Sequence, residues 1–370
     1  MHTRVCDMLG IEFPIFAFSH CRDVVAAVSK AGGMGVLGAL AFTPEQLEVE
    51  LTWIDEHVDG KPYGVDVVMP AKYEGAQFDA KTIVAELQKQ IPEGHKQFVE
   101  EVLDRYHVPK LPADDPPPQS LLGWTDATAR PQLDVSFKHP ISLLVNALGP
   151  PPPDVVEESH SRGVPVAALV GRTDQALRQK EVGVDIIVAQ GTEAGGHTGE
   201  VATMVLTPEV VEAVAPTPVL AAGGIGTGRQ MAAAMALGAD GVWTGSIWLT
   251  VAEADTNPIA VEKLLAADSR GTVRSRAMTG KPARQLRTGW TDAWEAADSP
   301  GTLPMPLQWM LTAEAQHRIF RYQPPELVGM PVGQIVGRMK EVRSARDVLF
   351  EMVQEAVETI EKLGGLATDS

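Results

Sequence analysis

Eight short apolar runs, separated by helical patterns, constrain the fold of this 370-residue chain more than any other feature. The runs are continuously apolar rather than alternating, which is typical of strands buried on both faces of a parallel sheet. Eight such units in succession predict a closed parallel barrel, and an open doubly wound sheet is the alternative. The runs are FPIFAF from Phe13, MGVLGAL from Met34, YGVDVVM from Tyr63, ISLLVNAL from Ile141, VPVAALV from Val164, DIIVAQ from Asp185, PVLAAGG from Pro218 and GVWTGS from Gly241.

The segments between the runs carry helical periodicity, and several close on glycine, the residue best suited to the end of a helix. Examples are DVVAAVSKAGG, TDQALRQKEVG and GRQMAAAMALG. These helices would cover the outer face of the barrel.

Two segments do not fit this repeat. Residues 71–140 separate the third run from the fourth. Within them, the amphipathic stretch AKTIVAELQKQIPEGHKQFVEEVLDRY predicts a helix. The prolines of VPKLPADDPPPQS, which follows it, exclude regular structure. Such an insertion would lie over one end of the barrel. We therefore predict a barrel over residues 1–260 with this insertion after the third strand, a smaller substrate-covering segment at 261–334, and a C-terminal helix within 335–370 that returns to the barrel wall.

The net charge of −17 and the isoelectric point near 5.0 argue against nucleic acid or an anionic membrane as a partner. No apolar run approaches the roughly 20 residues of a membrane helix, and the N-terminus lacks the pattern of a signal peptide. Cys6 and Cys21 are too few for a disulfide framework and have no metal-ligand spacing. We expect a cytoplasmic protein without a metal, and a homo-oligomer is compatible with the sequence.

Two glycine-containing loops follow the seventh and eighth runs. AAGGIGTGRQ contains Gly223 and Gly224, and WTGSIWL contains Gly245 and Ser246. In barrel enzymes these two loops commonly bind a phosphate, because backbone N–H groups and a helix N-terminus face the anion and glycine lets it approach closely. The alternative is that these glycines only make tight turns. Two such loops in adjacent units favour a phosphorylated cofactor over the barrel mouth.

The stretch AQGTEAGGHTGE follows the sixth run and contains the residue with the strongest catalytic pattern, His197. His197 comes after a strand end and a Gly-Gly pair, on the face of a barrel where chemistry occurs. An imidazole with a pKa near neutrality can accept a proton or donate a hydrogen bond. We predict that His197 is catalytic and that Glu193, in the same stretch, bonds loop backbone amides.

The same stretch, followed by PVLAAGGIGTGRQMAAAMALGADGVWTGS, resembles the nitronate monooxygenase family, formerly called 2-nitropropane dioxygenases. The resemblance extends through PIFAF, AAVSKAGGMGVLG and TGKPAR, and it covers most of the chain outside residues 71–140. The flavin-dependent enoyl-acyl-carrier-protein reductases share these motifs. The resemblance implies a TIM barrel, a (β/α)8 fold, with FMN bound at the carboxyl ends of the strands.

The resemblance also implies roles for particular residues. Gln190 would reach the flavin ring, Gly195 and Gly196 would let the backbone pass close to flavin and substrate, and Lys281 takes a position where relatives often have arginine. Lys281 is therefore a candidate substrate contact, with a solvated surface lysine as the alternative. The positions that match the family's FMN-binding residues are Gln190, Gly195, Gly196, Gly223, Gly224, Gly245 and Ser246.

The chain departs from the family pattern at two places. The first strand continues into Ser19 and His20 where the family has Ala-Pro-Met, and Asp66 stands where relatives often have asparagine. We expect these residues to make the pocket more polar or more charged, and we count Ser19 and His20 as further candidate substrate contacts. His20 could instead be only a helix-start residue.

Three functions follow from these interpretations. The first is oxidation of an alkyl nitronate by FMN and O2 to a carbonyl compound and nitrite. In that reaction a neutral His197 would remove the C–H proton of a nitroalkane, or a charged His197 would hold a preformed nitronate. The second is FMN-dependent reduction of an enoyl thioester by NAD(P)H. The third is a non-catalytic barrel that binds a phosphorylated ligand.

Overall fold

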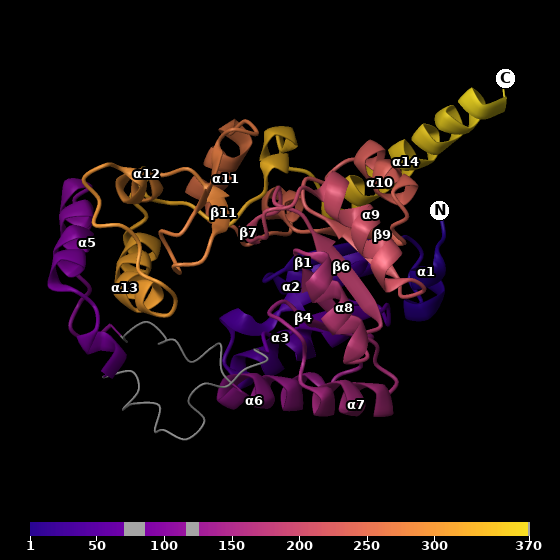
Figure 1. Cartoon of the computed structure of the whole chain (residues 1–370), viewed down its shortest axis with the longest axis horizontal. Coiled ribbons are helices and arrows are strands. Elements are labelled where there is room, and N and C mark those ends of the chain that lie inside the picture. The colour runs from indigo at the N-terminus through magenta and orange to yellow at the C-terminus, as the bar shows by residue number, and fades with distance from the viewer. Residues whose placement is uncertain (70–85, 116–125, 369–370) are drawn as a thin grey trace.

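The computed structural model describes residues 1–69, 86–115 and 126–368, and one closed barrel forms its centre (Figure 1). The strand order is β1-β2-β3-β4-β5-β6-β8-β9, and β9 pairs in parallel with β1 to close the ring. The closed parallel barrel predicted from the eight apolar runs is therefore confirmed. The strands are β1 (Ile15–Ser19), β2 (Met34–Gly38), β3 (Tyr63–Asp66), β4 (Leu143–Asn146), β5 (Val166–Val170), β6 (Ile186–Gln190), β8 (Val219–Ala222) and β9 (Gly241–Thr244).

Both faces of these strands are buried, which explains why the runs are continuously apolar. Phe16, Val188 and Trp243 belong to one apolar cluster, formed mostly by strand residues. Their sequence neighbours Ile15, Ile187 and Val242 belong to two other clusters, which include residues of the surrounding helices. Alternate side chains thus fill the inside of the barrel and the layer between strands and helices.

Helices surround the strands in the order expected for repeated β-α units. Gly32, Gly183 and Gly238 have positive φ angles after α2, α8 and α10, so glycine does end these helices. The N-terminal helix is α1 (Arg4–Leu9), and the helices that follow the barrel strands are α2 (Arg22–Lys30), α3 (Pro44–His57), α6 (Asp126–Ser136), α7 (Pro153–Ser161), α8 (Thr173–Glu181), α9 (Thr203–Val214), α10 (Gly228–Ala236) and α14 (Ala345–Thr368).

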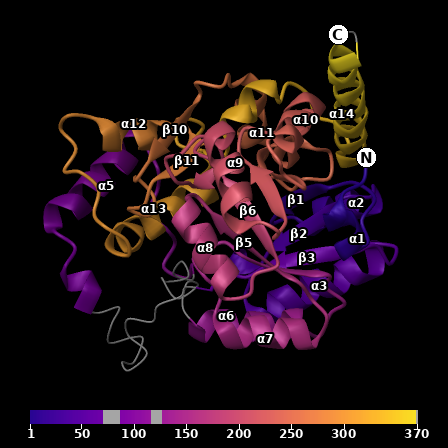
Figure 2. The same cartoon turned by 45° about the vertical axis from the view of Figure 1, so that its right-hand side comes forward.

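The helix after the eighth barrel strand is α14, which the chain reaches only after about a hundred residues. It packs against α10 and α2, and Figure 2 shows it on the outside of the barrel. Leu349, Met352 and Ala356, on one face of α14, are fully or almost fully buried. A side chain at Gly228 would lie 2.3 Å from backbone atoms of Met352 and Ala356, so glycine there permits close packing of α10 on α14.

Between β9 and α14 the chain forms a smaller unit beside the carboxyl end of the barrel. A three-stranded sheet has the order β10-β11-β7, and β7 (Gly196–His197) comes from the loop after β6. The other elements of this unit are α11 (Pro258–Ala266), β10 (Thr272–Ser275), β11 (Ala283–Leu286), α12 (Gly289–Glu295), α13 (Leu307–Tyr322) and the 3-10 helix η4 (Gln334–Arg338). The small sheet therefore joins the predicted catalytic stretch to residues more than eighty positions later.

The described part of the insertion packs against this smaller unit. Helix α5 (Glu93–Arg105) begins after Pro92, and Val102 shares an apolar cluster with Trp290 of α12 and Ile319 of α13. Arg318, 1% exposed, donates to Glu100 at 2.9 Å and to backbone carbonyls of the insertion. Residues 80–85 of the predicted amphipathic stretch and residues 116–120 of the proline-rich segment lie outside the described residues, whereas residues 108–115 of that segment form no helix or strand, as predicted.

The two cysteines, Cys6 and Cys21, are both buried free thiols. In the described ranges, no helix combines the length and the apolar character that crossing a membrane requires.

Candidate active site

The carboxyl ends of the eight strands meet at one rim of the barrel, where barrel enzymes place their chemistry. Ser19 ends β1, Asp66 ends β3, Asn146 ends β4 and Gln190 ends β6, so polar residues follow four of the strands to this rim. The glycine loops follow β8 and β9 at the same rim. The fold thus brings together candidate residues that are more than two hundred positions apart.

In the loop after β8, Gly223 and Gly224 have φ angles of 99° and 70°, which glycine adopts without strain. A side chain at Gly223 would lie within about 3 Å of Thr203 Oγ1 and of backbone atoms in the loop after β6. A side chain at Gly224 would meet Glu193 Cβ at 3.3 Å. Close packing between the two loops is therefore one reason for this glycine pair.

The loop after β9 has open space beside it. Gly245 has a φ of −131°, and an added Cβ would meet only the Phe18 carbonyl oxygen, at 4.0 Å. Among the described residues, the backbone N–H groups of Gly223, Gly224, Gly245 and Ser246 have no acceptor. Two adjacent loops therefore present unpaired backbone donors, an arrangement that fits a phosphate group. The Ser246 hydroxyl accepts from the Gly333 N–H at 2.8 Å.

The glycines before His197 differ from each other in their surroundings. A side chain at Gly195 would lie 2.9 Å from the backbone of Val332 and Gly333, so this glycine is required by contact with the chain itself. Gly196 has a φ of 75° and nothing within 4 Å of an added Cβ. Glu193 accepts from the N–H of Thr203 at 2.9 Å, so it does bond a backbone amide, although Thr203 is the first residue of helix α9 rather than part of the loop.

His197 lies in β7, paired with Ala283 of β11. Its Nε2 is 2.8 Å from the hydroxyl of Thr279, which lies in the turn between β10 and β11. The residue has exposed surface, and the protein atoms around its ring bury the imidazole in part. This burial, together with the positive charge of Lys281, lowers the pKa of His197 to about 4. The imidazole is therefore neutral at neutral pH.

Lys281 is exposed and lies near enough to His197 for its charge to act on the ring. None of the ion pairs between described residues includes Lys281, and the pairs in this part of the chain involve Arg270, Arg274 and Arg287. This ammonium group is free to meet an anionic group that approaches His197.

Ser19 and His20 follow β1 at the rim. Nδ1 of His20 is 2.8 Å from the Gly38 carbonyl oxygen, which can only accept, so Nδ1 carries the proton and Nε2 is left as an acceptor. Burial lowers the pKa of His20. The Ser19 hydroxyl accepts from the Cys21 N–H at 3.1 Å, at the start of α2. Both residues therefore also shape the chain locally.

Asp66 is 3% exposed, and its Oδ1 is buried without a hydrogen-bond partner among the described residues. Burial raises the pKa of this carboxyl to about 7, although the Ala147 N–H opposes the rise. Asp66 and His20 therefore both bring polar groups to this rim. Burial favours the neutral form of each, although a pKa of about 7 leaves Asp66 partly ionised at neutral pH.

Sequence reasoning missed three residues that organise this rim. Thr279 holds His197, and Thr203 joins Glu193 to the loop that contains Gly223. Asn146, fully buried, bonds the backbone of Met69 with both its amide oxygen and its amide nitrogen. The TGKPAR motif signals Thr279, whereas the other two depend on contacts between loops that the sequence pattern does not reveal.

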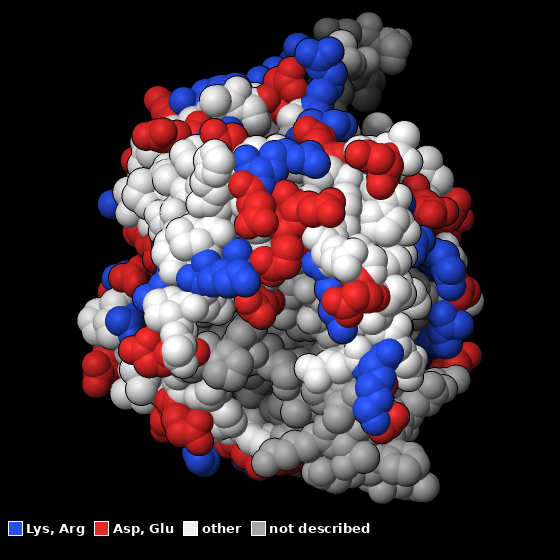
Figure 3. Space-filling model, turned by 90° about the vertical axis from the view of Figure 1, so that its left-hand side faces the viewer, with Lys and Arg blue, Asp and Glu red and all other residues white. Residues whose placement is uncertain are grey.

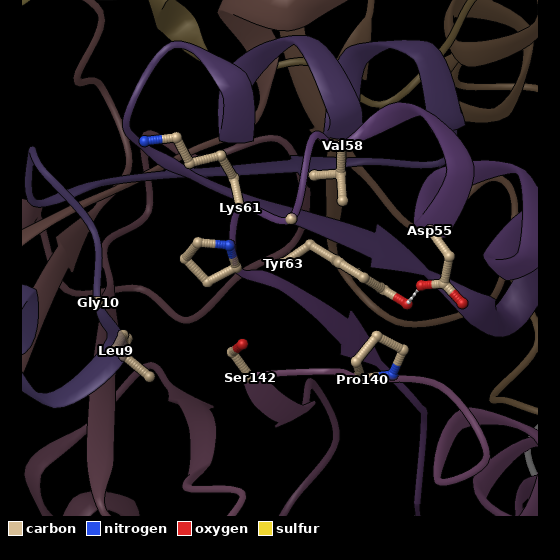
Figure 4. A pocket seen from close by; sticks show the side chains of 10 residues that line it. Leu9, Gly10, Asp55, Val58, Lys61, Tyr63, Pro140 and Ser142 are labelled. Atoms are coloured by element: carbon tan, nitrogen blue, oxygen red, sulfur yellow. Dashed lines mark hydrogen bonds between the residues drawn. The ribbon is translucent and has the colours of Figure 1, made fainter.

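One cavity, of about 240 Å³, lies at the opposite end of the barrel (Figure 4). Tyr63 begins β3, Ser142 precedes β4, and the Tyr63 hydroxyl donates to Asp55 at 2.6 Å. The amino ends of barrel strands contribute to stability rather than to chemistry. The rim with His197 is therefore the stronger candidate for the active site.

The chain belongs to the nitronate monooxygenase family, whose model matches residues 2–355. This family consists of flavin-dependent oxidoreductases, so the protein is an enzyme.

Three similar proteins illustrate the family and the fold. A Mycobacterium tuberculosis protein named "Putative monooxygenase" is 57% identical, and the match covers 99% of each chain. The structure of FabK from Thermotoga maritima matches with a TM-score of 0.72 at 28% identity, covering 99% of each chain. A nitroalkane oxidase from Streptomyces ansochromogenes matches with a TM-score of 0.79, covering 97% of this chain and 99% of that one. Its 24% identity supports the fold alone.

Proposed function

We propose that this enzyme uses FMN to oxidise alkyl nitronates, and the nitroalkanes from which they form, with O2 to a carbonyl compound and nitrite. The observation that carries the proposal is a neutral imidazole, His197, at the rim where two loops present unpaired backbone donors. Membership of the nitronate monooxygenase family supports the same reaction. The substrate would be a small molecule, with O2 as the second reactant.

The residues present fit FMN. The N–H groups of Gly223, Gly224, Gly245 and Ser246 would hold its phosphate, and Gly245 leaves room for that anion. Asp66 has a buried oxygen without a hydrogen-bond partner, and this oxygen would form a hydrogen bond with a polar edge of the flavin ring. Gln190, at the end of β6, would contact the ring from another strand. When bound, FMN would supply the chemistry of accepting electrons from the substrate and passing them to O2.

His197 would act on the proton next to the nitro group. A neutral imidazole can remove that proton, whereas an imidazolium cannot, and the lowered pKa of His197 favours the neutral form. Thr279 would orient the ring through Nε2. Lys281 would meet the negative charge that develops on the nitro oxygens, beside the positive charge that His197 acquires with the proton. A preformed nitronate would need Lys281 but not the proton transfer.

The first test is the identity of the chromophore. Protein purified with its chromophore should release FMN on denaturation, identified by mass. Release of FAD, or no FMN binding by the apoprotein, would contradict the cofactor assignment.

A second candidate is reduction of an enoyl thioester by NAD(P)H, and the similarity to FabK, an enoyl-acyl-carrier-protein reductase, favours it. Two measurements separate the two functions. In air, we expect ethyl nitronate to be turned over. In anaerobic stopped-flow absorbance, we expect NADH and NADPH to bleach the flavin slowly or not at all. Rapid bleaching by a nicotinamide, followed by reoxidation with an enoyl thioester, would establish the reductase instead.

A further inference from the structure

One segment beside His197 has a charge opposite to that of the whole chain. Residues 269–291 contain five arginines and one lysine but no aspartate or glutamate, although the net charge of the protein is −17. Strands β10 and β11 lie within this segment, and β11 pairs with the strand of His197. Figure 3 shows basic side chains scattered among acidic ones on the face of the molecule that carries α5, α12 and α13. The proposed reaction on a small nitronate uses only Lys281 of this positive charge.

Two of these arginines, Arg274 and Arg276, line a cavity of about 370 Å³ together with Trp294, Glu295 and Thr302. Because β10 is an edge strand of the small sheet, the cavity lies along an edge with no further strand. A volume near 370 Å³ is in the lower part of the range for small-molecule sites, roughly 300–1,000 Å³. The cavity therefore has room for an organic ligand of modest size.

The guanidinium groups in this cavity differ in how firmly they are held. Arg274 donates from Nε and Nη2 to Thr198, the residue after His197, both at 3.1 Å. Its nearest acidic oxygen, on the exposed Glu200, is 3.8 Å away. Arg276 donates to the Gly280 carbonyl at 3.1 Å and has no ion pair within the described ranges. One guanidinium is thus pre-oriented, and the other is available to a ligand.

Trp294 and Glu295 add a second, independent indication of a ligand. Trp294 is 4% exposed, and its indole N–H has no acceptor among the described residues. A buried indole N–H normally has a partner, and a ligand oxygen would supply one. Oε1 of Glu295 accepts from the Ser275 hydroxyl at 2.9 Å, and its second oxygen can accept a hydrogen bond from a ligand.

We propose that this cavity binds the phosphate group of a small organic phosphate monoester, in the form that still carries one proton. The planar guanidinium groups would bind two phosphate oxygens, since arginine matches the geometry of phosphate. Glu295 would accept the hydrogen bond of the protonated oxygen, which sulfate cannot offer at neutral pH. This site is separate from the glycine loops proposed for FMN.

Calorimetric titration of the FMN-loaded enzyme tests the proposal, with inorganic phosphate, propyl phosphate and sulfate as probes at pH 6. Loading with FMN fills the glycine loops, so these loops do not bind the probes. We expect at least one of the two phosphate probes to bind. Sulfate should bind at least about 10-fold more weakly than that probe. Stronger binding of propyl phosphate would identify an organic monoester as the ligand, and equal binding would identify free phosphate. Binding of neither phosphate probe would overturn the proposal.

Arg276→Gln should weaken phosphate binding by about 10-fold or more, because hydrogen bonds to charged groups contribute about 1.5–3 kcal/mol. The matched control is Arg270→Gln, which removes the same charge from an arginine that is 92% exposed and paired with Asp268. Trp294→Phe removes the N–H and keeps the aromatic packing, and a smaller loss is expected. Equal losses in Arg276→Gln and Arg270→Gln would overturn the site, because they would show only the effect of overall charge.

Glu295→Gln should remove the preference for phosphate over sulfate. Retention of that preference would overturn the role of the protonated oxygen. In each variant, turnover of ethyl nitronate measures the proposed reaction separately. A variant that loses phosphate binding but retains turnover supports a second site, and a wild-type enzyme that binds phosphate without oxidising nitronate would contradict only the proposed function.

Discussion

Gly245→Ala should weaken FMN binding while changing the stability of the apoprotein by about 1 kcal/mol or less. An added Cβ meets no atom closer than 4.0 Å, so the methyl group would occupy only the space in front of the loop. The φ of −131° and ψ of −57° lie outside the α and β regions, and the cost of placing alanine there opposes its gain from having fewer unfolded conformations than glycine.

The loss of FMN affinity follows from one hydrogen bond. If the Gly245 N–H donates to the phosphate, a methyl group that holds the anion away should cost about 1.5–3 kcal/mol, the contribution of a hydrogen bond to a charged group. The Kd for FMN should then rise roughly 10- to 150-fold. Quenching of FMN fluorescence during titration with apoprotein measures this Kd, and thermal unfolding of the apoprotein measures stability.

Two comparison variants make the result specific. Gly94→Ala places a methyl group at a position in α5 that also has nothing within 4 Å, far from the loops, and it should leave FMN binding unchanged. Gly224→Ala, at a φ of 70°, should lower stability as well as affinity, because the left-handed conformation costs alanine about 1–2 kcal/mol. Equal FMN affinities for Gly245→Ala and Gly94→Ala would refute the placement of the phosphate at the loop after β9.

Three further predictions concern His197 and Asp66. His197→Asn should retain FMN but lower turnover of neutral nitroethane by roughly 100-fold or more, with a smaller loss for ethyl nitronate; equal losses would limit His197 to binding or orientation. Because the pKa of His197 is about 4, kcat/KM for nitroethane should show no His197-dependent fall between pH 8 and pH 5.5. It should fall as the pH drops through about 4. A fall centred near pH 6.5 would show that the ring titrates normally. Asp66→Asn should stabilise the apoprotein increasingly as the pH rises from about 4 to 7, because the folded chain holds a proton on Asp66 that the unfolded chain releases. In urea unfolding, the gain in the free energy of unfolding should reach up to about 4 kcal/mol above pH 7. A constant difference between the two proteins across that pH range would contradict the raised pKa.

The barrel could be predicted from the sequence because burial on both faces leaves a local mark. A strand such as Ile186–Gln190 needs no polar residue between its ends, so its run of apolar letters reveals it. The glycine ends of helices are equally local, because a positive φ at Gly32 or Gly238 depends on a few neighbouring residues. Both features are read within about ten residues.

The site was predicted less completely, because its geometry depends on contacts between distant segments. Strand β7 has only two residues, and it exists because β11 pairs with it more than eighty positions later. Gly195 is required by contact with Val332 and Gly333, which no local pattern indicates. Thr279 holds His197 for the same long-range reason. Sequence patterns therefore indicate candidate residues, whereas the contacts of those residues depend on the fold.

The three titratable residues around the rim are shifted in the same sense, although they are of different types. Burial lowers the pKa of His20 and His197 and raises that of Asp66, and each shift favours the neutral form. These three side chains therefore add little charge to the rim, where Glu193 lies against Gly224 and its carboxylate accepts from the Thr203 N–H. Lys281 is the cation whose charge acts on His197. A substrate anion that reaches His197 would therefore be held by Lys281.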